Sequence, residues 1–328
     1  MTRHTARHEH RSSSLIATVI ALLAIVGSTA SVGAKPPMRY HLTRIEVPQD
    51  LGTIYARDIT NSGAVLGWSD SALFGVVFGR QEPKVFTIPG ATFIYPQGIS
   101  AGGTIIGNYD AEGGSIPFRR SPNGTVTSVV VPGTWYTVAP LDITDSGAII
   151  GIVCASAEGP CPGFVQSASG TRIVQIPGAR STYLTGMNNA GIIVGTWDDG
   201  AGSFGAFAIE RHGTVTPLDI AGASSFVPSD INDAGAIAGS YIDDDLGNRH
   251  GVVMRDGVFA TVDYPAPATI DYQDPGSGLV SELPLVAVDT EVLGINTRGS
   301  LTGNAFAYYS DGTFSTVQTV SFTGTPVR

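Results

Sequence analysis

Aromatic rings and carboxylates recur together along this chain. One set of rings follows predicted turns: Tyr55, Phe93, Tyr95, Trp135, Tyr136, Tyr183 and Phe226. A second set joins rings to acids: Trp68-Ser69-Asp70, Tyr109-Asp110, Trp197-Asp198-Asp199 and Tyr241-Ile242-Asp243. Rings offer flat apolar platforms and carboxylates accept hydrogen bonds, a combination that suits sugar recognition. The candidate ligand-binding residues are therefore Tyr55, Tyr95, Tyr183, Trp197, Asp198, Asp199, Tyr241 and Asp243. The alternative is that the rings pack between repeats and the acids are solvated.

The sequence favours binding over catalysis. It contains no nucleophile elbow, zinc-binding helix motif, phosphate-binding loop, dinucleotide fingerprint or EF-hand loop in a fitting context. His41, His212 and His250 are far apart in the sequence. We therefore expect a non-enzymatic binding or scaffold protein. The alternative is a polysaccharide hydrolase or lyase that uses paired carboxylates on the same face.

One acidic run raises the question of a metal. Asp243-Asp244-Asp245 could contribute to a Ca²⁺ site, which takes six to eight oxygen ligands. Consecutive side chains of an extended chain point to opposite sides, so three in a row seldom converge on one ion. We expect no cofactor and keep Ca²⁺ as the alternative.

The first 34 residues are typical of a cleaved signal peptide. Three arginines precede an uncharged stretch, Leu15 to Val26, and small residues precede a cut after Ala34, with Ala30 as the rival position. The stretch is too short to span a bilayer, which takes about 20 apolar residues. We expect an exported protein, periplasmic or extracellular, with a mature part of residues 35–328 that does not insert into the membrane.

Charge and cysteine content agree with export. The chain has 28 acidic and 18 basic residues, and a formal net charge of −10. An acidic chain repels nucleic acid and anionic membranes, so the expected partners are a glycan or an envelope or extracellular protein. Cys154 and Cys161 are predicted to form a disulfide, because an exported chain meets oxidising conditions.

A nine-residue pattern returns six times: Ile59–Gly67, Ile99–Gly107, Ile143–Gly151, Met187–Gly195, Ile231–Gly239 and Ile295–Gly303. In each copy an apolar residue ends one strand, a polar turn with glycine follows, and small or β-branched residues form the next strand. The turn glycines are those expected to need positive φ: Gly63, Gly103, Gly147, Gly191, Gly235 and Gly299. The closing glycine lets a neighbouring backbone come close.

The repeat predicts the fold. A second hairpin follows in each unit, as at Arg255-Asp256-Gly257, which gives four short antiparallel strands in about 44 residues. We predict an all-β chain of tandem four-stranded antiparallel units, a six-bladed β-propeller, with a β-solenoid as the alternative. The predicted units are about 51–90, 91–133, 134–178, 179–222, 223–265 and 266–320, the last with an insertion at 266–290.

Two consequences follow from this architecture. Loops that join units and loops between second and third strands lie at the same face, so the rings and acids would gather there. Ring closure is left open, because both Tyr40 to Pro48 and Thr313 to Val320 resemble the fourth strand of the last unit.

The repeat resembles that of the bacterial extracellular proteins known as the HAF family. Their units read approximately G-I-N-x-x-G-x-I-V-G-x-Y, then an H-A-F-like strand and a D-V-P-G-A-like end. Gly294-Ile295-Asn296 to Gly303 and Gly186-Met187-Asn188 to Trp197 match the first part. The H-A-F position matches His250-Gly251-Val252, Gly205-Ala206-Phe207 and Asn304-Ala305-Phe306, so the histidine is kept once. Ile176-Pro177-Gly178-Ala179 matches the end. The resemblance implies an extracellular location and supplies no catalytic residues.

Overall fold

The computed structural model describes residues 38–71, 73–244, 247–276 and 278–327. The predicted signal peptide lies outside these ranges. The described residues form twenty-five strands and one short 3-10 helix, η1 (Gln49–Leu51). Within them, no helix has the length and hydropathy needed to cross a membrane.

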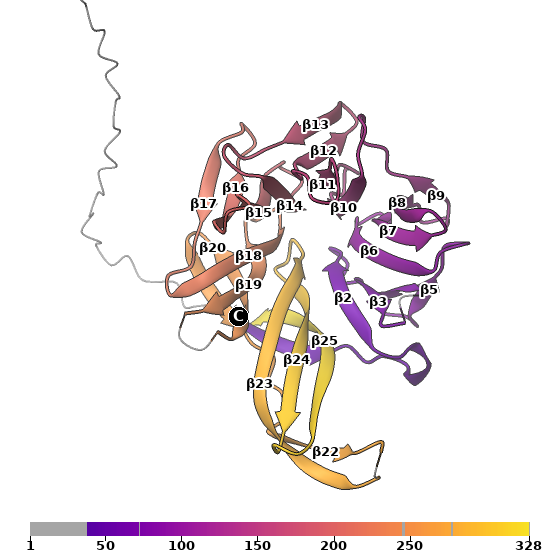
Figure 1. The fold of residues 1–328 in the computed structure, drawn as a ribbon, viewed down its shortest axis with the longest axis vertical. Coiled ribbons are helices and arrows are strands. Elements are labelled where there is room, and N and C mark those ends of the chain that lie inside the picture. Colours follow the sequence, from indigo (N-terminus) through magenta and orange to yellow (C-terminus); the bar gives the residue numbers. More distant parts are fainter. Residues whose placement is uncertain (1–37, 72, 245–246, 277, 328) are drawn as a thin grey trace, which may run out of the picture. The chain divides into compact units, whose positions relative to one another are not determined.

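Six antiparallel sheets surround a central axis, as Figure 1 shows, so the fold is the predicted six-bladed β-propeller and not a β-solenoid. Blade 1 contains β2 (Ile54–Ile59), β3 (Val65–Ser69), β4 (Gly75–Phe78) and β5 (Lys84–Phe86). Blade 2 contains β6 (Phe93–Ile99), β7 (Ile105–Ala111), β8 (Gly114–Arg120) and β9 (Val126–Ser128). Blade 3 contains β10 (Thr137–Ile143), β11 (Ile149–Cys154), β12 (Gly163–Ser167) and β13 (Gly170–Val174).

The remaining blades continue around the axis. Blade 4 contains β14 (Ser181–Met187), β15 (Ile193–Asp198), β16 (Phe204–Ile209) and β17 (Val215–Leu218). Blade 5 contains β18 (Ala223–Ile231), β19 (Ile237–Asp243), β20 (Arg249–Arg255) and β21 (Val258–Val262). Blade 6 is built from β23 (Val280–Ile295), β24 (Leu301–Ser310), β25 (Ser315–Val327) and β1 (Arg39–Arg44), and β23 also pairs with β22 (Thr269–Gln273).

The repeated turn joins the first and second strands of each blade. All six predicted turn glycines have positive φ, between 74° and 86°, which favours glycine. A polar side chain stabilises the same turn: Asn188 Oδ1 accepts the backbone N–H of Ile192 at 3.0 Å, and Thr60 Oγ1 accepts that of Ala64 at 3.0 Å. The Asn, Thr or Ser of the repeat therefore has a structural role.

The closing glycine of the repeat lies where first and second strands come closest. A Cβ on Gly195 would lie 2.0 Å from the carbonyl oxygen of Tyr183 and 3.0 Å from the ring of Phe207. The residue opposite this glycine on the third strand is a fully buried Phe in four blades: Phe118, Phe164, Phe207 and Phe322. In these four blades the core therefore depends on a large side chain facing glycine, whereas Val76 and Val252 take this position in blades 1 and 5.

Hydrophobic cores lie between neighbouring blades. Ile150 and Val165 of blade 3 pack with Leu184 and Phe207 of blade 4, and the same arrangement recurs around the ring. Burying one such side chain stabilises the fold by about 1.5–3 kcal/mol. Each blade thus needs its neighbours.

The N-terminal strand closes the ring. β1 pairs antiparallel with β25 and is the outer strand of blade 6. The sequence also allowed Thr313 to Val320 as this outer strand, but most of that segment belongs to β25, the third strand of the blade. The difference arises because β24 continues to Ser310 without a break, so Asn304-Ala305-Phe306 lies in the second strand. Phe322 then takes the buried aromatic position of the repeat.

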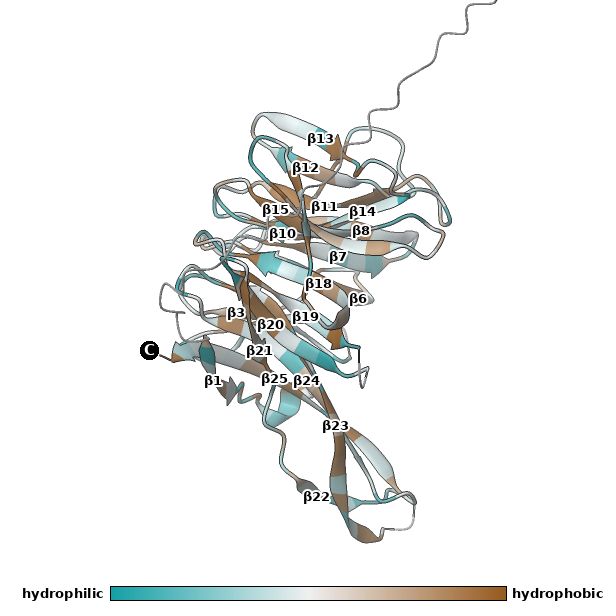
Figure 2. Cartoon of the chain, turned by 90° about the vertical axis from the view of Figure 1, so that its left-hand side faces the viewer, coloured by the Kyte–Doolittle hydropathy of each residue, from teal (hydrophilic) through white to brown (hydrophobic). Residues whose placement is uncertain are grey.

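The insertion at 266–290 contributes β22 and the first part of β23. β22 pairs with the first part of β23, and this hairpin projects beyond the blades in Figures 1 and 2. We call this extension the arm: β22 with residues 280–287, 307–310 and 315–318. It has its own small core of Leu283, Ala307 and Tyr309, covered by Ile270, Tyr272 and Phe314.

Candidate functional site

Each inner strand has a β-bulge just before its end. The ladder register shifts by one residue at Arg57, Gln97, Leu141, Thr185, Ser229 and Leu293. These six residues line a narrow cavity on the axis. Bulges re-aim side chains, and here they turn one residue per blade towards the axis.

The residue after each bulge alternates between Asp and Gly around the ring: Asp58, Gly98, Asp142, Gly186, Asp230 and Gly294. Each carboxylate bridges two blades. Asp142 accepts the N–H of Ile143 in its own blade at 2.6 Å and that of Met187 in the next blade at 2.8 Å. Asp58 and Asp230 make the equivalent pairs of bonds at 2.6–2.7 Å.

On the other side of each Asp blade, a glycine of the neighbouring blade brings the two backbones close together at the axis. A Cβ on Gly186 would lie 2.6 Å from the Cα of Asp230, and a Cβ on Gly294 would lie 3.1 Å from the Cα of Asp58. The glycines therefore allow close approach on one side of each Asp blade, while the carboxylates bond across the other. The ring is built from three pairs of blades.

Burial dominates the electrostatics of the axis. It raises the pKa of Asp142 to about 7, and the negative charge of Asp58 adds to the effect. Burial also raises the pKa of Asp58 and of Asp230. Burial lowers the pKa of the Arg57 guanidinium, although the charges of Asp58 and Glu291 oppose this. Three buried carboxyl groups are thus held close to one buried cation.

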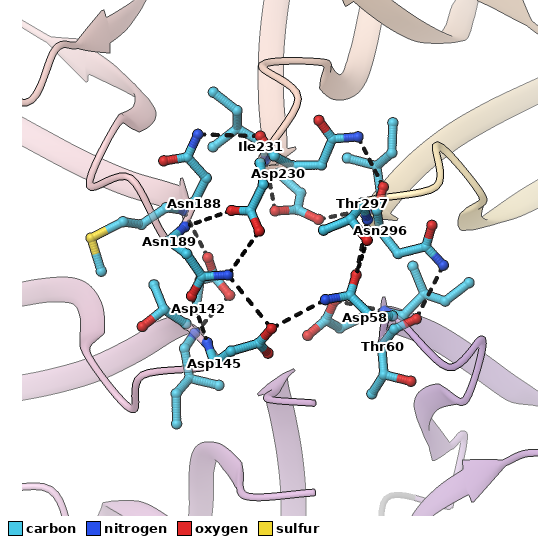
Figure 3. Close-up of a pocket in the computed structure, with 18 of the residues that line it drawn as sticks. Asp58, Thr60, Asp142, Asp145, Asn188, Asn189, Asp230, Ile231, Asn296 and Thr297 are labelled. Atoms are coloured by element: carbon cyan, nitrogen blue, oxygen red, sulfur yellow. Dashed lines mark hydrogen bonds between the residues drawn. The ribbon is translucent and has the colours of Figure 1, made fainter. Parts of the chain in front are cut away.

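A second layer of polar side chains covers the axial cavity. Figure 3 shows Asp145 and Asn189 reaching into its centre. Asp145 accepts hydrogen bonds from the Ala101 N–H at 2.7 Å and from Asn61 Nδ2 at 3.1 Å, while Asn189 Nδ2 donates to Asp233 at 3.0 Å. These side chains and the three buried aspartates line a pocket of about 70 Å³, which is room for a few water molecules.

The axial cavity therefore serves mainly to join the blades. Its three buried carboxylates already accept two N–H bonds each. Among the described residues no group of three or more His, Cys, Asp or Glu side chains is arranged to hold a metal ion. Sequence reasoning missed these aspartates, although the signal was present: the residue before the first apolar position of each repeat alternates between Asp and Gly.

The opposite face carries a run of aromatic rings. Tyr55 stacks on Trp68 with ring centroids 4.8 Å apart, and Trp68 meets Tyr95 edge-on at 5.8 Å. Tyr95 stacks with Phe93 at 6.2 Å, and Tyr55 contacts Phe306 at 6.5 Å. We call these five residues the ring cluster. It spans blades 6, 1 and 2 and brings together two predicted site residues, Tyr55 and Tyr95.

The rings of this cluster remain accessible. The Phe93 side chain is 43% exposed, and the other four residues are half-buried. They lie where second strands end and where connectors enter the next blade, so the predicted face is the one that carries them. Phe306 was missed because its place depends on how the ring closes.

Other predicted site residues lie apart from the ring cluster. Tyr183 and Trp197 belong to blade 4, where Tyr183 is 37% exposed and Trp197 lies over Gly205. Asp198 accepts the Gly200 N–H, and Asp199 accepts two N–H groups of the same loop. Hydrogen bonds from Ser203 and Ala201 hold the pKa of Asp199 below its usual value. These two acids therefore shape a turn.

Tyr241 and Asp243 belong to blade 5 and surround a histidine. The Tyr241 ring stacks on His250 with centroids 5.1 Å apart. His250 Nε2 lies 3.2 Å from Asp243, and Nδ1 lies 3.0 Å from Asp263. Partial burial works to lower the pKa of His250, but hydrogen bonds to Asp263 and Asp243 outweigh it and raise the pKa. Asp245, the last of the three consecutive acids considered as Ca²⁺ ligands, lies outside the described residues.

The two cysteines form the predicted disulfide. Cys154 and Cys161 have Cα atoms 4.2 Å apart and close the loop between β11 and β12. The carbonyl oxygen of Cys161 accepts the N–H of Thr182 at 2.9 Å. The bridge thus fixes a loop of blade 3 against the first strand of blade 4.

Comparisons with known proteins bear on the fold. No family model matches the chain, and no curated protein matches its sequence. A protein assigned as TolB from Agrobacterium tumefaciens has a TM-score of 0.50 at 13% identity, over 68% of this chain and 88% of its own. Virginiamycin B lyase from Staphylococcus aureus has a TM-score of 0.47 at 13% sequence identity, over 88% of this chain and 100% of its own. A gluconolactonase from Xanthomonas campestris has a TM-score of 0.46 at 8% sequence identity, over 90% of this chain and 98% of its own. At these identities the likeness concerns architecture alone, and the chain is a six-bladed β-propeller.

Proposed function

We propose that this protein is an exported, non-enzymatic binding protein that holds a glycan on the ring cluster. The observation that carries the proposal is the uninterrupted contact of five rings across three blades, at 4.8–6.5 Å between centroids. Rings that pack against one another on a surface form a rigid apolar platform, which loses little conformational entropy when it binds a sugar face.

The position of the ring cluster also supports a role in binding. The hydrophobic cores at blades 1 and 2 are formed by other residues, mainly aliphatic side chains and Phe, and do not include the five rings. The disulfide and the resemblance to HAF repeats support export, because an oxidising compartment preserves such a bond.

The acids of the same face favour binding over hydrolysis. Asp198 and Asp199 bond to their own loop, and Asp243 faces His250. Glu291 forms an ion pair with Arg249 at 2.8 Å. A glycosidase needs two carboxyl groups that face one cleft with separated pKa values, and the known partners of these acids do not supply that arrangement.

The test is binding of the mature chain to a panel of polysaccharides, with release of reducing ends assayed in the same wells. We expect binding without release. Phe93→Ala and Trp68→Ala should each weaken binding about tenfold, which is a loss of about 1.4 kcal/mol. Tyr136→Ala is the matched control, since Tyr136 is 69% exposed on a connector and lies outside the cluster.

The outcomes separate the alternatives. Release of sugar would favour the hydrolase or lyase. Binding that Tyr136→Ala weakens as much as Phe93→Ala does would show that the cluster is not the site. If Trp68→Ala lowers only the melting temperature and Phe93→Ala changes nothing, the rings serve packing and the proposal fails.

A further inference from the structure

The arm has one covered face and one open face. Leu283 and Tyr309 are buried on the covered face. On the open face Val280 is 67% exposed, Val286 66%, Val317 50% and Tyr308 38%. Figure 2 shows the arm projecting from the blades, where the blade sheets do not cover it. Contiguous apolar side chains exposed in this way mark interaction sites.

The apolar residues of the open face form a row. Tyr308 pairs with Val317 on one side and with Ala287 on the other, next to the bulged residue Val286. Cross-strand partners lie about 5 Å apart, so this row crosses three strands without interruption.

On the same face, four residues before Val286, two carboxylates lie opposite each other. Asp271 of β22 is directly opposite Glu282 of β23, and both are exposed. Like charges in this position destabilise a sheet. The chain has no Lys, Arg or His between residues 256 and 297, nor between 299 and 327, so nearby sequence supplies no cation to offset the pair.

Protection of the sheet edge explains why both residues are charged, but not why they carry the same charge. A charge on an edge strand discourages unwanted strand pairing, which would account for Asp271 on β22. At Glu282, β23 pairs with β22 alone, because its ladder with β24 begins at Leu285, so Glu282 also lies at an edge. Edge protection therefore accounts for a charge at each position, but not for two charges of the same sign placed opposite each other. The same acids also oppose pairing of two copies through this face, since they would bring four carboxylates together.

We propose that the open face of the arm docks a basic protein surface. Aliphatic side chains of the partner cover the row at Val286, Tyr308 and Val317, and its Lys or Arg side chains lie between Asp271 and Glu282. Charge complementarity selects this partner, because a desolvated cation offsets the repulsion that the free arm carries. This inference is independent of the glycan proposal.

The root of the arm holds its open face in place. Tyr308 Oη donates to Asp289 at 3.3 Å, and Asp289 also accepts the N–H of Arg249 in blade 5 at 3.2 Å. The Arg249–Glu291 ion pair lies beside them. A partner on the arm therefore meets a surface that is fixed relative to the neighbouring blade, which lowers the entropy lost on docking.

The test uses the mature chain and three labelled extended peptides, of Lys-Val, Lys-Ser and Glu-Val repeats, with binding measured by fluorescence anisotropy. We expect the Lys-Val peptide to bind about tenfold more tightly than the Lys-Ser peptide, and the Glu-Val peptide not to bind. The double variant Asp271→Asn/Glu282→Gln and the double variant Val286→Ser/Val317→Ser should each weaken Lys-Val binding about tenfold.

A matched control separates the arm from general attraction. Glu82→Gln/Glu112→Gln removes the same charge at exposed positions elsewhere and should change binding less than twofold. Equal binding of the Lys-Val and Lys-Ser peptides, or arm variants that bind like the wild type, would overturn the proposal. So would a concentration-dependent dimer that the arm variants abolish, or arm-dependent binding of a cationic oligosaccharide when no peptide binds.

Discussion

The axial carboxylates should make stability depend on pH in an unusual direction, and Asp142→Asn tests this. Burial raises the pKa of Asp142 from 3.8 to about 7, so the folded protein binds a proton that the unfolded chain has released between these pH values. Stability from this group is fully present below about pH 4 and is lost as the pH rises through 7.

The magnitude follows from the shift. About three pH units at 1.36 kcal/mol each give a loss of about 4 kcal/mol between pH 4 and pH 8. The variant lacks this titration and also removes the charge that raises the pKa of Asp230. It loses one of the two N–H bonds at every pH, at a cost of about 1–3 kcal/mol. We therefore expect Asp142→Asn to be less stable than the wild type at low pH and to gain on it between about pH 4 and pH 7.

The assay is urea unfolding followed by tryptophan fluorescence, with the chain's three tryptophans as reporters. The quantity compared is the free energy of unfolding of wild type minus variant at each pH. Glu112→Gln is the control, because it removes an exposed carboxylate that does not line the axial site. A difference that stays constant, or that grows with pH, would mean that the N–H bonds of Ile143 and Met187 outweigh burial, and the reasoning would be refuted.

Three further outcomes are expected. Gly186→Ala places a Cβ 2.6 Å from the Cα of Asp230 and should destabilise the protein by about 1–3 kcal/mol, whereas Gly79→Ala, with nothing within 4 Å, should be neutral; equal melting temperatures would contradict this. Hydrogen bonds raise the pKa of His250, so the stability that this residue contributes is present below pH 6.5 and is lost as the pH rises through the folded-state pKa. His250→Gln should therefore lower the melting temperature more at pH 6 than at pH 9. An equal loss at both pH values would argue against a charged imidazolium. Replacing both cysteines by serine should cost about 2–3 kcal/mol with unchanged far-ultraviolet circular dichroism; no shift in thermal unfolding would show that the loop is held by its other contacts.

The fold could be predicted from the sequence because each copy of the repeat contains the residues that form its turns. Glycine at positive φ and glycine under a close backbone recur at the same places in every copy, so four-stranded units could be counted. Ring closure was not accessible, since β1 and the Thr313 to Val320 segment have similar patterns. What decides between them is the length of β24, which runs on because no turn residue interrupts Asn304 to Tyr309.

The candidate site could be predicted from the sequence only in part. Tyr55 and Trp68 are cross-strand partners, so their contact follows from register within one unit. Contacts of Tyr95 with Trp68 and of Phe306 with Tyr55 cross between blades, and they require the order of the ring. Tyr183, Trp197 and Tyr241 share the same face by topology, but they lie in other blades, and a common rim does not place side chains in contact.

The alternation of Asp and Gly at the axis imposes a rule of parity on the whole architecture. Around a ring with an even number of blades, every Asp blade has a Gly blade on both sides. Inserting or deleting one blade would force two like neighbours together somewhere. Two Asp blades would collide where glycine now allows backbones to approach within 2.6–3.3 Å of a Cβ position, and two Gly blades would meet with no carboxylate between them. Growth of such a chain by duplication is therefore favoured in steps of two blades, and a five- or seven-membered ring with this pattern would be frustrated at one seam.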